Sequence, residues 1–196
     1  MNAQSDTLTR LLMQDRRASY YRLRGGFPVL FAGATYWGVL TAAGYFANQY
    51  TWFLIALLGS GAIFPAALFY SKVFRIDFMQ DRTSVTSVLL PAFIAMLLFW
   101  PMAIAALWEA PAIFPLIMAI GLSLHFPVIG WAYGRTAIYS AHALFRAIIV
   151  FVIWWKLPEH RLTLLPLSVT AIYLLTALIV VVDSNRFRDV ERPVLD

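Results

Sequence analysis

Residues 111–133 read PAIFPLIMAIGLSLHFPVIGWAY and residues 137–155 read AIYSAHALFRAIIVFVIWW, with only Gly134, Arg135 and Thr136 between them. An α-helix needs about 20 mostly apolar residues to cross the hydrocarbon core of a bilayer. Neither stretch alternates apolar and polar residues in the manner of a membrane β-strand. The two stretches therefore predict two membrane-spanning helices, and the short turn makes them antiparallel neighbours.

Four further stretches of the same kind complete an all-α prediction, a polytopic membrane bundle of six helices arranged as three antiparallel hairpins. The predicted spans are 26–46, 51–70, 86–108, 111–133, 137–155 and 163–182. Only 13% of the 196 residues are charged and 61% are hydrophobic, against a usual charged share of about 25%. This composition excludes a secreted module, an ordinary cytosolic enzyme and a protein that binds nucleic acid. The chain has no cysteine, which excludes disulfides and thiolate chemistry.

Lysine and arginine are distributed unevenly between the two sides of the predicted bundle. Twelve of the fifteen lie in the N-terminal arm, the 71–85 loop, the 134–136 turn and the C-terminal tail, which share one side. Lys156 and Arg161 lie on the other side, and Arg146 lies inside a span. Because basic loops stay in the cytoplasm, we predict that both termini are cytoplasmic.

The predicted domain organisation has three parts. Residues 1–25 form a basic amphipathic arm on the cytoplasmic side, residues 26–183 form the six-helix domain, and residues 184–196 form a cytoplasmic tail. In the arm, Leu8, Leu11, Leu12 and Leu23 are expected near one face, and five arginines are expected to meet anionic lipid headgroups. We interpret the arm as a solvated segment that only sets the orientation, with the binding of a specific partner as the alternative.

A weak internal repeat relates the first two hairpins. The first and third spans align at an offset of 63 residues, and the second and fourth at an offset of 62. This pattern predicts a parallel duplication, with shared membrane composition as the alternative. Three prolines, Pro65, Pro101 and Pro127, lie inside spans, where proline kinks a helix. Each kinked helix either lines a cavity or is kinked only for packing.

Two small-residue patterns predict close helix contacts. They are the stripe Ala34, Gly38 and Ala42 and the pair Gly130 and Gly134. We assign both to packing inside the bundle, and self-association into a homo-oligomer stays open as the alternative.

The most informative residues are His125, His142 and Arg146, which lie inside the two stretches quoted first. At 1.5 Å rise per residue they lie about 14, 11 and 16 Å from the connecting turn, so all three share one layer. Ionisable groups at this depth normally face protein, water or a ligand. The acid predicted to lie nearest in depth, Asp183, starts roughly 15 Å from Arg146. The layer is therefore either structural or a ligand pathway, with Arg146 as the anion contact.

Aromatic residues at the same depth suggest walls for such a site. We predict Trp100 and Trp131 as walls, with Trp37, Tyr36 and Phe99 as further members of an aromatic cluster. Two histidines without a third ligand fall short of a metal site. The chain carries none of the motifs HExxH, GxSxG or a phosphate loop, so neither a cofactor nor a catalytic residue is predicted.

The order of motifs resembles a family of small bacterial multi-pass membrane proteins known only as a domain of unknown function. The matching stretches are Gly26-Phe27-Pro28 with Trp37, Pro65 with Ser71-Lys72 and Arg75-Ile76-Asp77, Phe99-Trp100-Pro101, and His125-Phe126-Pro127 with Trp131-Ala132-Tyr133 and Tyr139. The resemblance implies a multi-pass protein of the bacterial inner (plasma) membrane and brings no activity. Tyr133 and Tyr139, which belong to these motifs, join the candidate ligand-binding residues.

Together these observations predict a small transporter or binding protein for a small anionic, aromatic or lipid-like solute, with its site on the fourth and fifth spans. The alternative is a non-catalytic scaffold or partner subunit in which the polar layer only holds helices together. A weaker alternative is an intramembrane enzyme acting on a lipid, with His125 or His142 as acid–base group.

Overall fold

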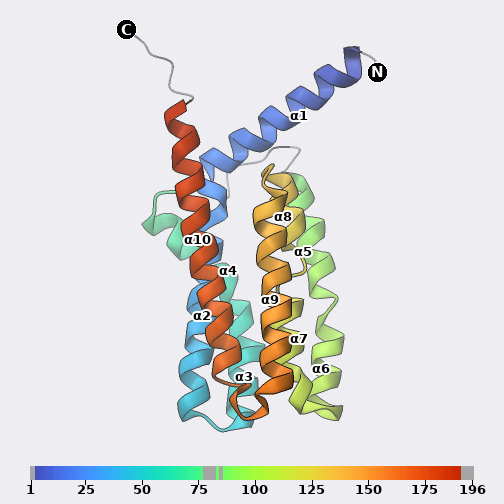
Figure 1. The fold of residues 1–196 in the computed structure, drawn as a ribbon, viewed down its shortest axis with the longest axis vertical. Coiled ribbons are helices and arrows are strands. Elements are labelled where there is room, and N and C mark those ends of the chain that lie inside the picture. The colour runs from blue at the N-terminus through green and yellow to red at the C-terminus, as the bar shows by residue number, and fades with distance from the viewer. Residues whose placement is uncertain (1–2, 77–82, 84–85, 191–196) are drawn as a thin grey trace.

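The computed structural model describes residues 3–76, 83 and 86–190, and all regular structure in this part of the chain is helical. Within it, six helical segments are long and apolar enough to cross a membrane, and they stand side by side as a bundle (Figure 1). The predicted fold class is confirmed. The segments are Arg24–Phe46, Gln49–Val73, Leu89–Glu109, Pro111–Ala132, Thr136–Lys156 and Leu164–Arg186.

The bundle begins with α1 (Ala3–Arg22), which precedes the spans. Three spans contain one continuous helix each: α2 (Phe27–Phe46), α9 (Thr136–Lys156) and α10 (Leu164–Val190). The other three are each built from two helices: α3 (Gln49–Gly59) with α4 (Ile63–Val73), α5 (Leu89–Leu97) with α6 (Trp100–Glu109), and α7 (Phe114–Gly121) with α8 (Phe126–Ala132). Short 3₁₀ turns complete them: η1 (Arg24–Gly26), η2 (Ser60–Ala62), η3 (Thr86–Val88), η4 (Pro111–Ile113) and η5 (Pro158–His160).

The three broken spans are those that contain an internal proline. Pro65, Pro101 and Pro127 each lie in the first turn of the helix that follows a break. Proline has no N–H to donate and its ring clashes with the preceding turn, so a helix restarts at proline more easily than it continues through it. The breaks in the second and fourth spans fall at equivalent places, after Gly59 and Gly121. The first span is continuous and the third is broken, so these two spans differ in this respect.

Packing arranges the spans around α9 and α10. Helix α10 packs against α2 on one side and against α9 on the other. Helices α7 and α8 pack on α9, α5 lies against α8, α6 lies against α7, and α3 contacts α7 (Figure 1). The first and fifth spans therefore meet α10, the helix of the sixth span, and the buried residues His142, Arg146 and Thr176 lie between them.

Most residues of the small-residue patterns pack inside the bundle, as predicted: Ala34 is buried, Gly38 faces Thr170 of α10, and Gly130 lies against α9. Helices α2 and α10 approach closely at Gly33, where a Cβ atom would lie 2.5 Å from the Tyr173 ring, whereas Ala42 of the predicted stripe is exposed. Gly130 and Gly134 belong to the α8–α9 turn. The Arg135 N–H donates to the Gly130 carbonyl at 2.8 Å and the Gly134 N–H donates to that of Trp131 at 3.0 Å. These are the two hydrogen bonds of a Schellman motif, which ends α8.

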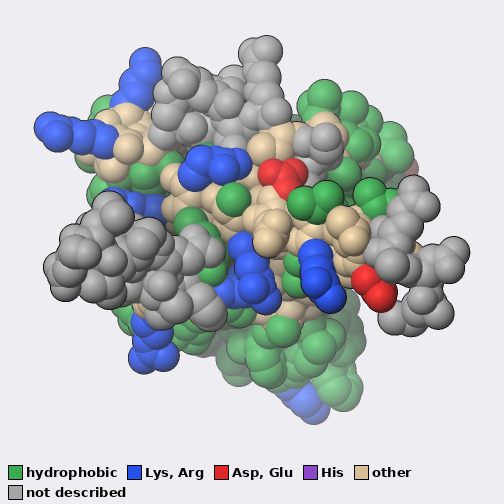
Figure 2. Space-filling model, turned by 90° about the horizontal axis from the view of Figure 1, so that it is seen from above, with side chains coloured by type: hydrophobic (Ala, Val, Ile, Leu, Met, Phe, Trp, Pro, Cys, Tyr) green, Lys and Arg blue, Asp and Glu red, His purple; other side chains and the backbone are tan. Residues whose placement is uncertain are grey.

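Both termini lie at the same end of the bundle (Figure 1), and lysine and arginine side chains gather on that end (Figure 2). Helix α1 projects obliquely from it, with Leu8, Leu11 and Leu12 exposed. Leu23, which was predicted to share their face, follows α1 and is buried in the core together with Tyr20. The arm is therefore partly built into the bundle. The predicted tail begins inside α10, which continues to Val190, and residues 191–196 lie outside the described part of the chain.

Exposed aromatic side chains mark the opposite end of the bundle. Tyr45, Tyr50, Trp108 and Trp155 are all exposed there, as expected for residues that lie at a membrane interface. Trp52 is instead buried and donates its indole N–H to the Leu40 carbonyl at 2.9 Å. Trp52 therefore fastens α3 to α2.

Candidate functional site

Helix α9 carries both polar residues of the fifth span on one face. His142 and Arg146 are four residues apart, and both are buried, with Arg146 fully so at 0% exposure. Arg146 lies ten residues from each end of α9, which places it about 15 Å from either end. Leu144 and Phe145, which point elsewhere, are exposed. The polar face of α9 is therefore turned into the protein at mid-depth.

The surroundings of Arg146 come from α2 and α10. Its Nη1 donates a hydrogen bond to the Tyr173 hydroxyl at 3.1 Å. The guanidinium carbon lies 5.1 Å from the centre of the Trp37 ring and 5.2 Å from that of Tyr173. Both distances are in the range of cation–π attraction. Nε and Nη2 of Arg146 have no hydrogen-bond partner among the described residues, and none of the described carboxylates pairs with this cation.

The hydrogen bonds of Thr176 indicate which nitrogen of the neutral His142 ring carries the proton. The Thr176 hydroxyl donates to the Ile172 carbonyl at 2.8 Å. It has one hydrogen, so in its 2.8 Å contact with His142 Nδ1 it is the acceptor. His142 Nε2 is then an unprotonated acceptor, and it has no partner in the described part of the chain.

His125 lies at the start of α8, where the fourth span is broken. Its ring contacts Phe93 and Phe126 at centroid distances of 4.8 and 4.9 Å, and its Nδ1 is unpartnered within the described residues. Phe126 also stacks on His142, with ring centres 4.2 Å apart and planes 7° apart. Both histidines lie within electrostatic range of Arg146. We call Trp37, His125, His142, Arg146, Tyr173 and Thr176 the polar cluster.

Several buried polar atoms of this cluster lack partners among the described residues. The donors are Nε and Nη2 of Arg146 and Nε1 of Trp37, and His142 Nε2 is an acceptor. Each buried polar group that stays unsatisfied costs about 1–3 kcal/mol. The cluster therefore offers several hydrogen-bonding positions and one positive charge to a polar group placed among them.

An apolar cleft lies beside the cluster, between α2, α5 and α8. Its empty volume is about 520 Å³, including its open mouth. Phe126 forms part of its wall, so one aromatic ring separates the cleft from His142. The lining residues are Gly25, Gly26, Pro28, Val29, Leu30, Leu89, Phe93, Phe126, Ile129, Tyr133 and Tyr139.

The seven predicted site residues divide into three groups. His125, His142 and Arg146 belong to the polar cluster, and Tyr133 and Tyr139 line the cleft. Trp131 is 40% exposed and stacks with Arg16, while Trp100 is half-buried and packs on Phe99 with ring centres 5.8 Å apart. These two tryptophans are not walls around Arg146 in this structure.

Sequence reasoning missed Tyr173 and Thr176 of the last span. The available signal was weak: two hydroxyl side chains three residues apart in an apolar helix, which places them on one face. Trp37 was expected in an aromatic cluster, but its position over Arg146 follows from how α2 faces α9, which hydropathy does not encode. The two rings that face Arg146 are thus supplied by Trp37 of α2 and Tyr173 of α10.

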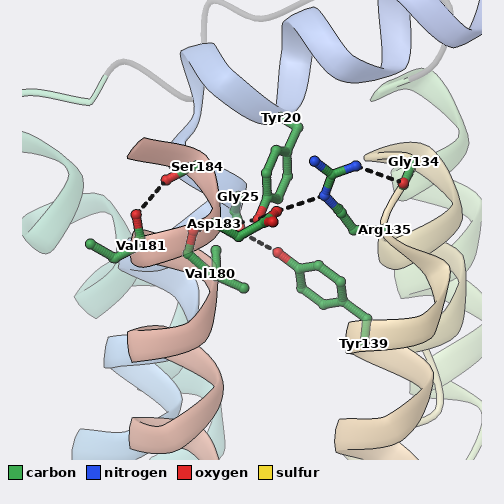
Figure 3. A network of polar contacts seen from close by, with 9 residues as sticks. All are labelled: Tyr20, Gly25, Gly134, Arg135, Tyr139, Val180, Val181, Asp183 and Ser184. Atoms are coloured by element: carbon green, nitrogen blue, oxygen red, sulfur yellow. Dashed lines mark hydrogen bonds and ion pairs between the residues drawn. The ribbon is translucent and has the colours of Figure 1, made fainter. Parts of the chain in front are cut away.

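A second polar network holds the end of the bundle that carries the termini (Figure 3). Arg135 Nε donates to Asp183 Oδ2 at 2.6 Å, and the Tyr20 hydroxyl donates to the same oxygen at 2.8 Å. The Tyr139 hydroxyl donates to the Gly25 carbonyl (Figure 3). We call these five residues the end clamp. Asp183 is therefore engaged with Arg135 rather than with Arg146.

The protonation states of the end clamp favour its closed form. Burial, followed by the hydrogen bond and charge of Asp183, raises the pKa of the Tyr20 hydroxyl, against a smaller opposing effect of Arg135. Burial lowers the pKa of Arg135, but the hydrogen bond and charge of Asp183 outweigh it and raise the pKa overall. Tyr20 therefore stays a donor and Arg135 stays a cation at neutral pH.

Arg16 ties α1 to the fourth span beside the end clamp. Its Nε donates to the Trp131 carbonyl at 2.6 Å, and its guanidinium carbon lies 4.7 Å from the centre of the Trp131 ring. Burial lowers the pKa of Arg16 below its ordinary value. The second half of α1 is thus held against both α8 and α10.

Replacing Asp183 by alanine is expected to loosen α1 more than it destabilises the whole protein. Arg135 and Tyr20 both lose their shared acceptor, but the ion pair is partly exposed and its contribution is about 1 kcal/mol or less. Trypsin should therefore cleave α1 at Arg10 and Arg17 faster, with a small change in melting temperature. Glu109→Ala, at an exposed acid on the opposite end, is the control. Equal cleavage rates in parent and Asp183→Ala would show that the clamp does not hold α1.

Six apolar helices of membrane-spanning length, packed around a fully buried arginine, define a polytopic helical membrane protein. The chain belongs to the family of unknown function DUF7010, whose model matches residues 13–183. This match confirms the predicted resemblance to a domain family of unknown function. No curated protein and no solved structure matches the chain. Among the described residues, no group of three or more His, Cys, Asp or Glu side chains is placed to hold a metal ion.

Proposed function

We propose that this protein binds a small anionic solute at the polar cluster, as a small transporter or binding protein of the membrane. The observation that supports this is the state of Arg146. It is fully buried at mid-depth, two of its three nitrogens are unpartnered within the described residues, and no described carboxylate pairs with it.

The energetic argument concerns the cost of a buried charge. A charged side chain at the centre of a membrane helix costs about 2.5–3.5 kcal/mol even by the lower measures. The two rings and the Tyr173 hydroxyl offset part of this cost, but none of them carries a negative charge. An anion at Arg146 Nε and Nη2 neutralises the charge and satisfies both donors at once.

The test measures thermal unfolding of the purified protein in sodium acetate, benzoate, octanoate or phosphate, against sodium chloride at equal ionic strength. At a ligand concentration of 100 Kd, binding to the folded state stabilises it by about 2.7 kcal/mol. We expect at least one of these anions to raise the melting temperature saturably in the parent protein. We expect no such rise in Arg146→Gln.

Arg161→Gln is the matched control, because Arg161 also packs over a tryptophan, Trp154, with 4.7 Å between guanidinium carbon and ring centre, but lies at the end of the bundle. It should keep the anion response. A response that survives unchanged in Arg146→Gln, or the lack of any saturable response across the four anions, would contradict the proposal.

The scaffold alternative is favoured by one specific observation. Arg146 on α9 contacts Tyr173 on α10 and Trp37 on α2, so one side chain joins three spans. In this reading the cluster holds helices together and binds nothing. Arg146→Gln would then lower the melting temperature in every salt by the same amount.

We also propose that the end with both termini faces the cytoplasm of a bacterial cell, with the protein in the inner membrane. Two features support this orientation: the basic side chains gathered on that end (Figure 2) and the exposed aromatic residues at the other. Exposed Leu8, Leu11 and Leu12 beside exposed Arg10 and Arg17 suit the first half of α1 to a surface of anionic lipids.

A further inference from the structure

We infer that the polar cluster and the apolar cleft are two halves of one site for a single-chain carboxylic acid, a fatty acid taken from the surrounding bilayer. Its carboxylate binds Arg146 and its hydrocarbon chain lies in the cleft. This inference rests on the proposed function and adds the class of ligand.

The unpartnered edge of Arg146 matches a carboxylate. Nη1 is held by the Tyr173 hydroxyl, which leaves Nε and Nη2. These two nitrogens lie on the same edge of the planar guanidinium and direct their N–H bonds in parallel, as a bidentate carboxylate requires. The Trp37 indole N–H, on the ring that covers the guanidinium, is a third donor without a described partner.

The charge of the cluster favours a monoanion. Among the described residues, the buried lysine and arginine side chains are Arg16 and Arg146, and Arg16 lies beside Trp131 outside the cluster. A phosphate monoester carries up to two negative charges and would leave one of them uncompensated at this depth. A carboxylate leaves none.

The cleft suits a hydrocarbon chain. Apart from the two tyrosines, its side chains are all apolar, as the lining of a site for a hydrocarbon chain should be. Leu89 and Phe93 contribute one wall from α5, whose neighbouring residues Leu90 and Ile94 are exposed on the outside of the bundle. A chain in the membrane therefore meets the cleft at the edge of α5.

Phe126 connects the two halves. Its ring lines the cleft, stacks on His142 at 4.2 Å and contacts Tyr173 at 5.7 Å, and Tyr173 holds Arg146. Rotation of this one side chain joins the cleft to the cluster.

The test compares sodium acetate, octanoate and laurate as ligands of the protein in phosphatidylcholine nanodiscs, with thermal stabilisation as the readout. Because each buried methylene adds to affinity, laurate should bind tighter than acetate by about tenfold or more. Val29→Phe fills the cleft from α2 and should reduce laurate affinity about tenfold, with acetate binding unchanged. Val39→Phe, an exposed position on the same helix away from the cleft, should alter neither.

The outcomes separate this inference from the proposed function. The inference about the hydrocarbon chain fails if acetate and laurate bind with equal affinity and both need Arg146. It also fails if Val29→Phe and Val39→Phe change the affinity for laurate by the same amount. In both cases the proposal of anion binding stands. If no carboxylate binds in an Arg146-dependent way, the proposed function fails as well. If phosphatidylglycerol displaces laurate, the occupant is a two-chain lipid and the inference is overturned. Leu89→Phe fills the same cleft from α5 should Val29→Phe not fold.

Discussion

Replacing Arg146 by methionine is expected to raise the melting temperature of the protein and to abolish its response to carboxylates. Methionine has nearly the length of the arginine stem and keeps the contacts with Trp37 and Tyr173. It removes a buried charge that no described carboxylate compensates. Replacing buried charged groups by well-packed apolar ones often stabilises proteins by about 1–4 kcal/mol, and each kcal/mol is about 2–4 °C for a chain of this size.

The opposing terms in Arg146→Met are the two cation–π contacts and the hydrogen bond to the Tyr173 hydroxyl. The two contacts contribute about 0.5–2 kcal/mol each, and a hydrogen bond to a charged group about 1.5–3 kcal/mol. The desolvation of an ion is several kcal/mol and is not returned by neutral partners. We therefore expect a net gain in stability together with a loss of ligand response.

The control is Arg161→Met, at the end of the bundle, which loses a cation–π contact and a hydrogen bond with Trp154 and should lower stability by about 1 kcal/mol. The measurement is thermal unfolding of each purified variant in sodium chloride and in octanoate. A clear loss of stability in Arg146→Met would favour the scaffold alternative, because removing a cation whose role is to join three spans should weaken the packing of those spans.

Replacing Gly25 by alanine is expected to be strongly destabilising. Gly25 joins α1 to α2 with a φ of 60°, in the left-handed region, where a residue with a side chain costs about 1–2 kcal/mol. A Cβ atom there would lie 2.7 Å from the Tyr20 ring, and overpacking of this kind costs about 1–3 kcal/mol more. The carbonyl of Gly25 also accepts the Tyr139 hydrogen bond, which a shifted backbone would lose.

Gly61→Ala is the matched control, because a Cβ atom there meets nothing within 4 Å. We expect Gly25→Ala to lower the melting temperature and to expose α1 to trypsin, and Gly61→Ala to do neither. If the two alanine variants unfold at the same temperature, the junction of α1 and α2 is not a fixed element of the fold.

Much of the architecture follows from the amino-acid sequence. Apolar stretches of about 20 residues can only be helices in a bilayer, because each must satisfy its own backbone hydrogen bonds. Proline cannot continue a helix as other residues do, so Pro65, Pro101 and Pro127 mark the three breaks. The spacing of four residues between His142 and Arg146 places them on one face. These are local properties of the chain.

The partners of those residues depend on how the helices are rotated and packed. Hydropathy is nearly uniform around a membrane helix, so it does not say that Trp37 and Tyr173 face Arg146 or that Asp183 meets Arg135. Depth along the helix predicted Trp131 as a wall of the site, whereas the packing of α1 places Trp131 against Arg16. Arg146 could be recognised from the sequence as a charge that orientation does not explain. Its neutral, aromatic surroundings and its free edge are a product of three spans meeting along α10.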